Sequence, residues 1–411
     1  MKNYKGFIDP KPKRNRMTTN LRRQVWAEIN RSHFAHNISL VKQRLDSKTR
    51  LLLVLKADAY GHGASALARV GLEQGAHYFG VATLDEALEL KEALVPKPGE
   101  INLAAPKILI MGYTPPSSAK EAIEENLELC LYELGWAMEL DKIARGLRRR
   151  AKVHLKLDTG MNRLGYQLNA KSLSEIEGIL SLANIEVVGL FTHFATADST
   201  DLSHLDRQHR EFLDFVKAIK GLGSFKDCAP ILHSANSAAI LSAPQSHGDM
   251  VRLGIMAYGL RPSLEMDMKG LDLRAVMSFK ARVVCVKDIE VGGAVSYGRR
   301  FIAPKKTRIA VLPVGYADGY MRLLSNKACV LIRGQRARVV GAICMDHCMV
   351  DITEIPGVMV GDCALLFGED NGSHLSVDEV ASHLGSINYE LVCAVSKRVY
   401  RVYVDEPYWI L

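Results

Sequence analysis

The sequence lacks long apolar runs. No stretch of the 411 residues approaches the roughly 18 apolar residues that a membrane-spanning helix needs. No apolar segment follows the basic N-terminal residues, as a secretion signal would require. We therefore expect a cytoplasmic protein that does not act at a membrane. Hydrophobic residues make up 48% and charged residues 24%, which also excludes the disordered class.

The eight cysteines lack the spacing of a disulfide framework or a zinc site. The one close pair, Cys344 and Cys348, flanks Met-Asp-His. A structural zinc ion needs four ligands, and no second pair with similar spacing lies nearby. We predict no metal ion and interpret the cysteines as reduced structural residues.

The body of the chain carries little net charge. Residues 1–24 contain eight basic residues and one acid, so nearly all of the formal charge of +8 lies in this segment. A nucleic-acid-binding protein needs a basic face on its folded part, and we therefore expect no nucleic-acid partner. Because the segment also contains Pro10 and Pro12, we predict that residues 1–24 form a basic, disordered tail.

Eight short apolar runs alternate with stretches of helical periodicity, such as 65–74 and 84–93. The runs lie at 51–55, 78–82, 107–111, 128–132, 153–157, 187–191, 230–233 and 250–256. Eight strand-helix units predict a (β/α)₈ barrel over residues 25–265. Catalytic groups are then expected at the C-terminal ends of the strands.

The chain from residue 266 onward has a different pattern. Short β-type runs follow one another closely and are separated by glycines, which predicts a mostly antiparallel β domain over 266–411. The runs lie at 278–286, 294–302, 308–314, 328–333, 337–344, 348–352 and 363–367. Ser376, with Asp378 and Glu379 behind it, is predicted to begin one late helix.

Lys56 directly follows the first apolar run, Leu51–Leu55. An ammonium group at the end of a buried strand loses hydration, which lowers its pKa and makes the free amine available as a nucleophile or base. The alternative is that the side chain of Lys56 simply extends to solvent.

Strands seven and eight end in groups suited to an anion. Asn236 and Ser237 precede a short apolar helix, and Gly254 and Ile255 offer backbone N–H groups. Barrel enzymes frequently bind phosphate at the loops after these two strands. A helix cap and a packing glycine would be the plainer interpretation, but together with Lys56 these residues predict a phosphorylated cofactor.

A buried lysine and a phosphate site on a barrel indicate pyridoxal 5'-phosphate, held as a Schiff base and used as an electron sink. Arg252, on strand eight, is the candidate partner of the pyridine nitrogen. Arginine keeps its proton, so the ring would stay unprotonated and be a weaker sink, which limits side reactions such as transamination. Pairing of Arg252 with a rim carboxylate is the alternative.

Several motifs together resemble the bacterial alanine racemase family, over nearly all of the chain beyond the tail. They are Lys56-Ala-Asp-Ala-Tyr-Gly-His-Gly, His154-Leu-Lys-Leu-Asp-Thr-Gly-Met-Asn-Arg-Leu-Gly, Phe191-Thr-His-Phe-Ala-Thr-Ala-Asp, Met250-Val-Arg-Leu-Gly-Ile, Val295-Ser-Tyr-Gly, Gly315-Tyr-Ala-Asp-Gly-Tyr, Cys344-Met-Asp and Ile387-Asn-Tyr-Glu. The resemblance implies a fold-type III enzyme, with a barrel before a β domain, assembled head-to-tail as a homodimer. The segment Val395-Ser-Lys-Arg-Val-Tyr-Arg departs from the family's commoner Ser-Tyr-Arg-Val-Pro-Arg pattern.

The resemblance also assigns roles. Lys56 would exchange the Cα proton on one face of the substrate, and the partner subunit's Tyr297 would serve the other face, with His193 and Arg252 making the surroundings cationic. The cofactor would be held by Tyr60, Asn236, Ser237, Gly254, Ile255 and Tyr389, and Arg163 would contact its ring hydroxyl and the substrate carboxylate. Met345 and Asp346 from the partner would close the substrate side, with Tyr316 nearby. Lys156 matches a position that is often carboxylated.

The predicted function is interconversion of L-alanine and D-alanine, supplying D-alanine for peptidoglycan. Met345 and Tyr389 favour a tight pocket suited to alanine. Two alternatives stay open: a racemase of the same fold acting on another small amino acid such as serine, or a barrel-type amino-acid decarboxylase.

Overall fold

The computed structural model describes residues 21–96, 105–225 and 229–405, so residues 1–20 of the predicted tail lie outside the described residues. The chain divides into two compact units. The barrel unit comprises Ile29–Ser278, Phe367–Ser396 and the residues from Tyr403 onward. The β-domain unit comprises the residues up to Glu28, Phe279–Leu366 and Lys397–Val402. Each unit is described by itself below.

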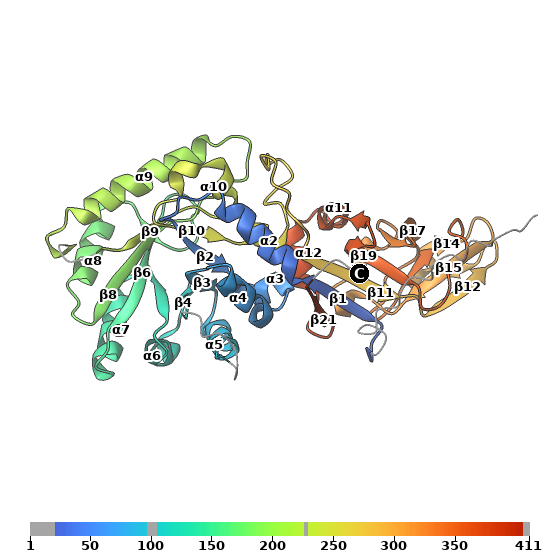
Figure 1. Ribbon diagram of the computed structural model, residues 1–411, viewed down its shortest axis with the longest axis horizontal. Helices are drawn as coiled ribbons and strands as arrows, with labels where there is room; N and C mark the ends of the chain where they lie inside the picture. Colours follow the sequence, from blue (N-terminus) through green and yellow to red (C-terminus); the bar gives the residue numbers. More distant parts are fainter. Residues whose placement is uncertain (1–20, 97–104, 226–228, 406–411) are drawn as a thin grey trace, which may run out of the picture. The chain divides into compact units, whose positions relative to one another are not determined.

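The barrel unit contains eight parallel strands in the order β10-β2-β3-β4-β5-β6-β8-β9 (Figure 1). They are β2 (Arg50–Val54), β3 (Tyr78–Val81), β4 (Lys107–Ile110), β5 (Glu128–Leu131), β6 (Ala151–Asp158), β8 (Ile185–Phe191), β9 (Ile231–His233) and β10 (Met250–Leu253), with β7 (Tyr166–Gln167) beside β6. Asp249 donates from its backbone to Leu232 (2.9 Å) and Arg252 to Ala235 (3.0 Å), which nearly closes the barrel between β9 and β10. The predicted (β/α)₈ barrel is confirmed.

The strands follow the apolar runs because they are buried on both faces. Leu51 to Val54 of β2 and all four residues of β10 are buried, as parallel strands covered by helices require. The helices lie outside the strands in Figure 1. They are α2 (Arg31–Lys42), α4 (Ala64–Glu73), α5 (Leu84–Ala93), α6 (Pro116–Glu124), α7 (Leu134–Gly146), α8 (Ala170–Leu180), α9 (Ser203–Lys220) and α10 (Ser237–Ser242).

The other sheet is mostly antiparallel, as predicted. Its strand order is β12-β15-β18-β17-β16-β19-β11-β1-β21, with β20 paired to β19. The pairs from β12 through β15, β18, β17 and β16 to β19 are all antiparallel. The strands are β1 (Val25–Asn30), β11 (Met277–Arg282), β12 (Cys285–Ile289), β15 (Thr307–Leu312), β16 (Cys329–Ile332), β17 (Gln335–Val339), β18 (Cys348–Asp351), β19 (Cys363–Asp370), β20 (Ser373–Leu375) and β21 (Tyr400–Val404).

Three parts of this region differ from the sequence prediction. The run 278–286 covers two strands, β11 and the first part of β12. The run 294–302 is not one strand but two short ones, β13 (Ala294–Val295) and β14 (Phe301–Ile302), with a tight turn between them. The predicted late helix is α11 (Val377–Ser382), where Ser376 accepts a hydrogen bond from the backbone N–H of Glu379 (3.0 Å). A second helix, α12 (Asn388–Ala394), follows it and was not predicted, because seven residues are too few to show a clear period.

No helix within the described residues combines the length and the apolar character needed to cross a membrane. The described residues also contain no cluster of three or more His, Cys, Asp and Glu side chains that could bind a metal ion.

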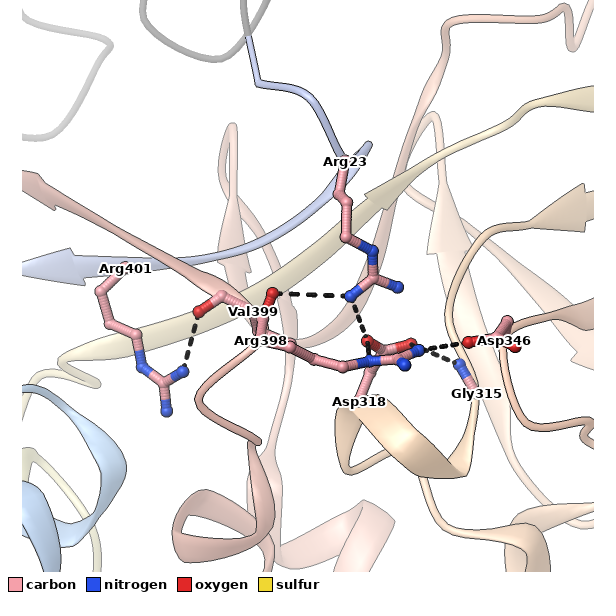
Figure 2. Close-up of polar contacts among 7 residues, drawn as sticks. All are labelled: Arg23, Gly315, Asp318, Asp346, Arg398, Val399 and Arg401. Atoms are coloured by element: carbon pink, nitrogen blue, oxygen red, sulfur yellow. Dashed lines mark hydrogen bonds and ion pairs between the residues drawn. The ribbon is translucent and has the colours of Figure 1, made fainter.

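A buried carboxylate organises part of the β-domain unit (Figure 2). The side chain of Asp318 is fully buried and accepts hydrogen bonds from Arg23 Nη1 (2.6 Å), Arg398 Nε (2.8 Å) and the backbone N–H of Gly315 (3.0 Å). Burial alone would raise the pKa of Asp318, but the hydrogen bonds from Arg398, Arg23 and Gly315 outweigh it and lower the pKa. Asp318 is therefore a charged anchor that also holds Arg23, within the predicted tail.

We predict that Asp318→Asn destabilises the protein by about 3 kcal/mol at pH 7, because it leaves two arginines without their buried partner. A carboxylate whose pKa is lowered by folding stabilises above its unfolded pKa of about 3.9, and that contribution disappears as the pH falls through the folded pKa. The difference between variant and wild type should therefore shrink as the pH falls below about 4.

Urea unfolding at pH 7 and at several acid pH values measures this difference. The control is Glu354→Gln, which breaks the exposed pair with Lys305 and should change the stability by less than about 1 kcal/mol. A difference for Asp318→Asn that stays constant from pH 7 to pH 2 would contradict the prediction.

Candidate active site

A pocket of about 700 Å³ opens at the C-terminal ends of the barrel strands. It is lined by all the barrel residues that the sequence assigns to the site: Lys56, Tyr60, Lys156, Arg163, His193, Asn236, Ser237, Arg252, Gly254, Ile255 and Tyr389. These residues come from strands and loops that are far apart in the chain. The structure therefore places these predicted site residues around one pocket.

Lys56 enters the pocket through an unusual turn. It begins α3 (Lys56–Gly61), in which the four residues Ala57–Tyr60 have left-handed φ values of 52° to 53°. The turn is held by hydrogen bonds from the backbone N–H of Ala57 to Glu86 Oε1 (2.7 Å) and from that of Gly63 to the carbonyl of Asp58 (3.0 Å). The turn places both Lys56 and Tyr60 against the pocket.

The pKa of Lys56 lies below its ordinary value. Burial is the largest cause, and the positive charge of Arg163 lowers the pKa further, while Glu86 and Cys393 oppose the shift. A larger fraction of the amine is therefore unprotonated near neutral pH. The half-buried side chain lines the pocket, in agreement with a nucleophile or base.

Three groups converge at one end of the pocket. The backbone N–H of Gly254 donates to the Ser237 hydroxyl (2.8 Å), and a Cβ atom at Gly254 would lie 2.9 Å from the Tyr60 hydroxyl and 3.6 Å from that of Ser237. Glycine thus keeps a small polar cradle free of a side chain. The rings of Tyr60 and Tyr389 lie with their centroids 6.1 Å apart. The side chain of Asn236 caps α10 instead, accepting from the N–H of Ala239 (3.0 Å).

Arg252 is buried, and its described partners are carbonyl oxygens and imidazoles rather than a rim carboxylate. It donates to the carbonyls of Thr192 (2.8 Å), His233 (2.8 Å) and Ser234 (2.9 Å). Burial lowers the pKa of Arg252 to about 9, which still leaves it a cation at neutral pH. This geometry favours the predicted role over pairing with a carboxylate.

A chain of buried hydrogen bonds leads away from Arg252, and no motif in the sequence predicted it. Arg252 Nη1 lies 3.1 Å from His233 Nδ1, His233 Nε2 lies 2.9 Å from His154 Nδ1, and His154 Nε2 lies 2.6 Å from Glu128 Oε2. If each donor points toward Glu128, every nitrogen in the chain is satisfied by neutral imidazoles. Burial, and then Arg252 and His154, keep the pKa of His233 well below its ordinary value, which agrees with this order.

The carboxylate at the end of this chain stays ionised. Burial would raise the pKa of Glu128, but the hydrogen bond from His154 and the positive charge of Lys107 lower it. The only signal in the sequence was that His154 and Lys156 share one face of a strand, two residues apart.

The lowered pKa of His193 does not favour its expected cationic role. Burial, and then the charges of Arg252 and Arg163, lower the pKa of His193 well below its ordinary value. Its imidazole is therefore neutral at pH 7, and positive charge near the pocket comes from the arginines.

Lys156 is buried, and its Nζ lies 5.4 Å from the centroid of the Phe191 ring. Burial is the main cause that lowers the pKa of Lys156; Arg163 and Arg252 act in the same direction, and Cys130 opposes them. An amine in these surroundings is available to react as a nucleophile.

The remaining predicted site residues belong to the β-domain unit. Tyr297, Tyr316 and Met345 are exposed by 74%, 43% and 53%, and the Asp346 side chain by 49%. Ser296, which precedes Tyr297, has a left-handed φ of 65°, and its hydroxyl donates to the Ala342 carbonyl (2.6 Å). The turn that presents Tyr297 is thus fixed to the segment that leads to Met345.

Comparison with known families matches nearly the whole described chain. Residues 29–262 match the family described as "Alanine racemase, N-terminal domain", and residues 276–403 match "Alanine racemase, C-terminal domain". The alanine racemase of Desulfovibrio desulfuricans is 46% identical over 383 residues, which cover 93% of this chain and 99% of that protein.

Solved structures agree with this match. The alanine racemase of Clostridium difficile 630 has a TM-score of 0.87 and 36% identity, covering 94% of this chain and 97% of that one. The Bacillus anthracis alanine racemase with bound L-Ala-P has a TM-score of 0.85 and 32% identity, covering 94% and 96%.

The turn that carries Lys56 generates a prediction at Gly61. This residue has a φ of +79°, and a Cβ atom there would lie 2.3 Å from the Val392 carbonyl oxygen. We expect Gly61→Ala to destabilise the protein by more than about 2 kcal/mol, since left-handed geometry and a backbone clash combine. Urea unfolding measures the change.

The control is Gly146→Ala at the end of α7, where nothing lies within 4 Å of an added Cβ atom. It should leave the stability unchanged or raise it by up to about 1 kcal/mol, because alanine favours a helix. Equal effects of the two substitutions would show that the turn tolerates a side chain.

Proposed function

The chain belongs to the alanine racemase family, and we propose that it interconverts L-alanine and D-alanine with pyridoxal 5'-phosphate as cofactor and two bases, Lys56 and Tyr297 of the partner subunit. The D-alanine would supply peptidoglycan synthesis.

The surroundings of Arg252 carry this proposal. Its contacts with carbonyls and imidazoles fix the guanidinium at the pocket, and we propose that it faces the pyridine nitrogen, where an acid would make the cofactor a stronger electron sink. A donor that keeps its proton at neutral pH leaves the pyridine nitrogen unprotonated, which favours proton exchange at Cα over stronger electron withdrawal. This arrangement supports a racemase over a decarboxylase.

The residues present fit the cofactor. Bound pyridoxal phosphate would supply an electron sink for the Cα carbanion. Lys56, with its lowered pKa, would hold the cofactor covalently. The hydroxyls of Tyr60 and Ser237 and the backbone at Gly254 and Ile255 would accommodate its phosphate, with Tyr389 beside Tyr60.

Inversion needs a base on each face of the substrate, since one removes the proton and the other returns a proton to the opposite side. Lys56 would act on one face and the partner subunit's Tyr297 on the other. A phenol titrates near pH 10 in water, so its phenolate needs positive charge nearby, for which Arg163 and Arg252 are the candidates. Arg163 would also bind the substrate carboxylate.

We propose a head-to-tail homodimer in which each site combines Lys56 of one chain with Tyr297, Tyr316, Met345 and Asp346 of the partner subunit. In the β-domain unit the large apolar side chains of Ile302 and Leu323 are 54% and 66% exposed, in addition to Tyr297 and Met345. Apolar side chains of this kind mark an interaction surface where they form one contiguous patch, which the proposed dimer would cover.

We predict that Lys56→Ala and Tyr297→Phe each lower racemisation by roughly 10²- to 10⁴-fold, the usual contribution of a general base. If the sites are shared, mixing the two inactive variants should restore part of the activity, because a mixed dimer contains one site with both bases intact. D-Alanine formation is measured before and after mixing. Tyr400→Phe is the control for loss of a partly exposed hydroxyl.

Retained activity in both single variants would refute the two-base mechanism. Failure of the mixture to recover activity, despite exchange of subunits, would refute the shared site.

The products decide between the candidate functions. The holoenzyme is incubated in deuterium oxide with L-alanine, L-serine and L-lysine in turn, and D-enantiomer, deuterium at Cα, carbon dioxide and amine are measured. D-Alanine without carbon dioxide supports the proposal. A faster reaction with serine would identify the other racemase, and release of carbon dioxide and amine would identify a decarboxylase.

We also propose that Lys156 is carboxylated, since its buried amine has a lowered pKa and could add carbon dioxide. The carbamate would orient Arg163 through a charge-assisted pair. Native mass spectra should show one extra carboxyl group per chain in bicarbonate buffer, and Lys156→Arg should lack it. An unmodified mass for the wild type in that buffer would contradict carboxylation of Lys156.

A further inference from the structure

The segment that carries Met345 and Asp346 is fastened to the turn at Tyr316. The backbone N–H of Tyr316 donates to the Cys344 carbonyl (3.1 Å), and that of Ala317 to the Met345 carbonyl (3.1 Å). A Cβ atom at Gly315 would lie 2.2 Å and 2.3 Å from these two oxygens, so the backbones approach closely. The backbone of the segment is thus held firmly, while its side chains are half exposed.

A single arginine fixes the exposed Asp346 side chain (Figure 2). Arg398 donates from Nε to Asp318 Oδ1 (2.8 Å) and from Nη2 to Asp318 Oδ2 (3.3 Å), and the same Nη2 also donates to Asp346 Oδ1. Asp318 is fully buried and Asp346 is half exposed. The guanidinium therefore links the buried Asp318 to Asp346. Without this link, the Asp346 side chain could adopt several rotamers.

The same contact neutralises Asp346. Arg23 and Arg398 balance the charges of Asp318 and Asp346 in this cluster. If Arg398 were absent, Asp346 would carry an uncompensated negative charge. An amino-acid substrate brings a carboxylate of its own, and two like charges at close range repel each other.

We infer that Arg398 is a positioning residue for the substrate: by joining Asp318 to Asp346, it fixes Asp346 in one orientation and cancels its charge on the side that receives the substrate carboxylate. The inference rests on the proposed function, which places Asp346 beside the substrate in the partner subunit's site.

Arg23 provides the matched control. It binds the same Asp318 carboxylate at 2.6 Å, but its described contacts do not include Asp346. Arg23→Gln and Arg398→Gln therefore both weaken the buried anchor, and only Arg398→Gln releases Asp346. A second control, Arg401→Gln, removes a positive charge three residues further along the chain, in β21; Arg401 donates to the Val399 carbonyl in Figure 2.

The kinetic test compares these variants as holoenzymes. We expect Arg398→Gln to raise the KM for alanine about tenfold, the equivalent of one hydrogen bond to a charged group, with a much smaller change in kcat. Arg23→Gln should lower the melting temperature without raising KM, and Arg401→Gln should change neither. Adding Asp346→Asn to Arg398→Gln should bring KM part of the way back, because it removes the uncompensated carboxylate.

Equal KM changes in Arg23→Gln and Arg398→Gln, or a double variant worse than Arg398→Gln alone, would show that Arg398 only supports the fold and would overturn the inference. Binding of propionate, an alanine without its amino group, gives a second readout through the absorbance of the bound cofactor. Its dissociation constant should rise in parallel with KM.

The orientation of the Asp346 side chain gives a third readout that needs no turnover. Crystal structures should show this side chain in a different or disordered rotamer in Arg398→Gln and unchanged in Arg23→Gln, because only the former releases Asp346. An Asp346 side chain that keeps one orientation in both variants would overturn the positioning itself. A wild-type enzyme that forms no D-alanine, but whose variants show the expected change in Asp346, would contradict the proposed function and leave Arg398 as the residue that holds Asp346.

Discussion

The left-handed turn after the first barrel strand is the constraint on which the pocket depends. Four consecutive residues, Ala57–Tyr60, adopt a conformation that costs roughly 1–2 kcal/mol for each non-glycine residue. Such a turn persists only where its surroundings determine it. Glu86 supplies much of that determination, since its two oxygens accept from the N–H groups of Ala57 and Ala82, both at 2.7 Å. Lys56 and Tyr60 thus face the pocket because a carboxylate outside it holds the backbone.

An excess of positive charge then defines what the pocket can bind. Lys56, Lys156, Arg163 and Arg252 all line it, and positive neighbours contribute to lowering the pKa of both lysines. Bringing these cations close together is unfavourable, and Asp198 and Glu390, which also line the pocket, offset only part of the charge. A ligand that carries a phosphate and a carboxylate would relieve the remaining repulsion. The lowered pKa of Lys56 and the affinity for an anionic ligand therefore arise from the same arrangement of charge.

The repeated pattern of apolar runs predicted the barrel strands. Contacts between individual residues far apart in the chain could not be predicted from the sequence. Eight apolar runs located eight strands because strands buried on both faces are apolar throughout. The two-residue strands β13 and β14 and the seven-residue helix α12 are too short to show a period. His154, His233 and Glu128 meet only inside the folded barrel, since 79 and 26 residues separate the pairs in the chain. The neutral state of His193 likewise follows from burial, which no motif reveals.

The arginines of the two units have opposite surroundings: neutral groups in the barrel and carboxylates in the β-domain unit. This difference bears on how a racemase could recognise alanine. In the barrel, Arg252 is buried among neutral partners, so its charge remains available to a ligand. In the β-domain unit, Arg398 and Arg23 are paired with carboxylates, so that the loop with Met345 is nearly neutral. A small zwitterion such as alanine gains little from hydrophobic contact. Under the proposed function, recognition would therefore depend on full positive charge on the barrel side of the substrate and cancelled charge on the side of the partner subunit's loop.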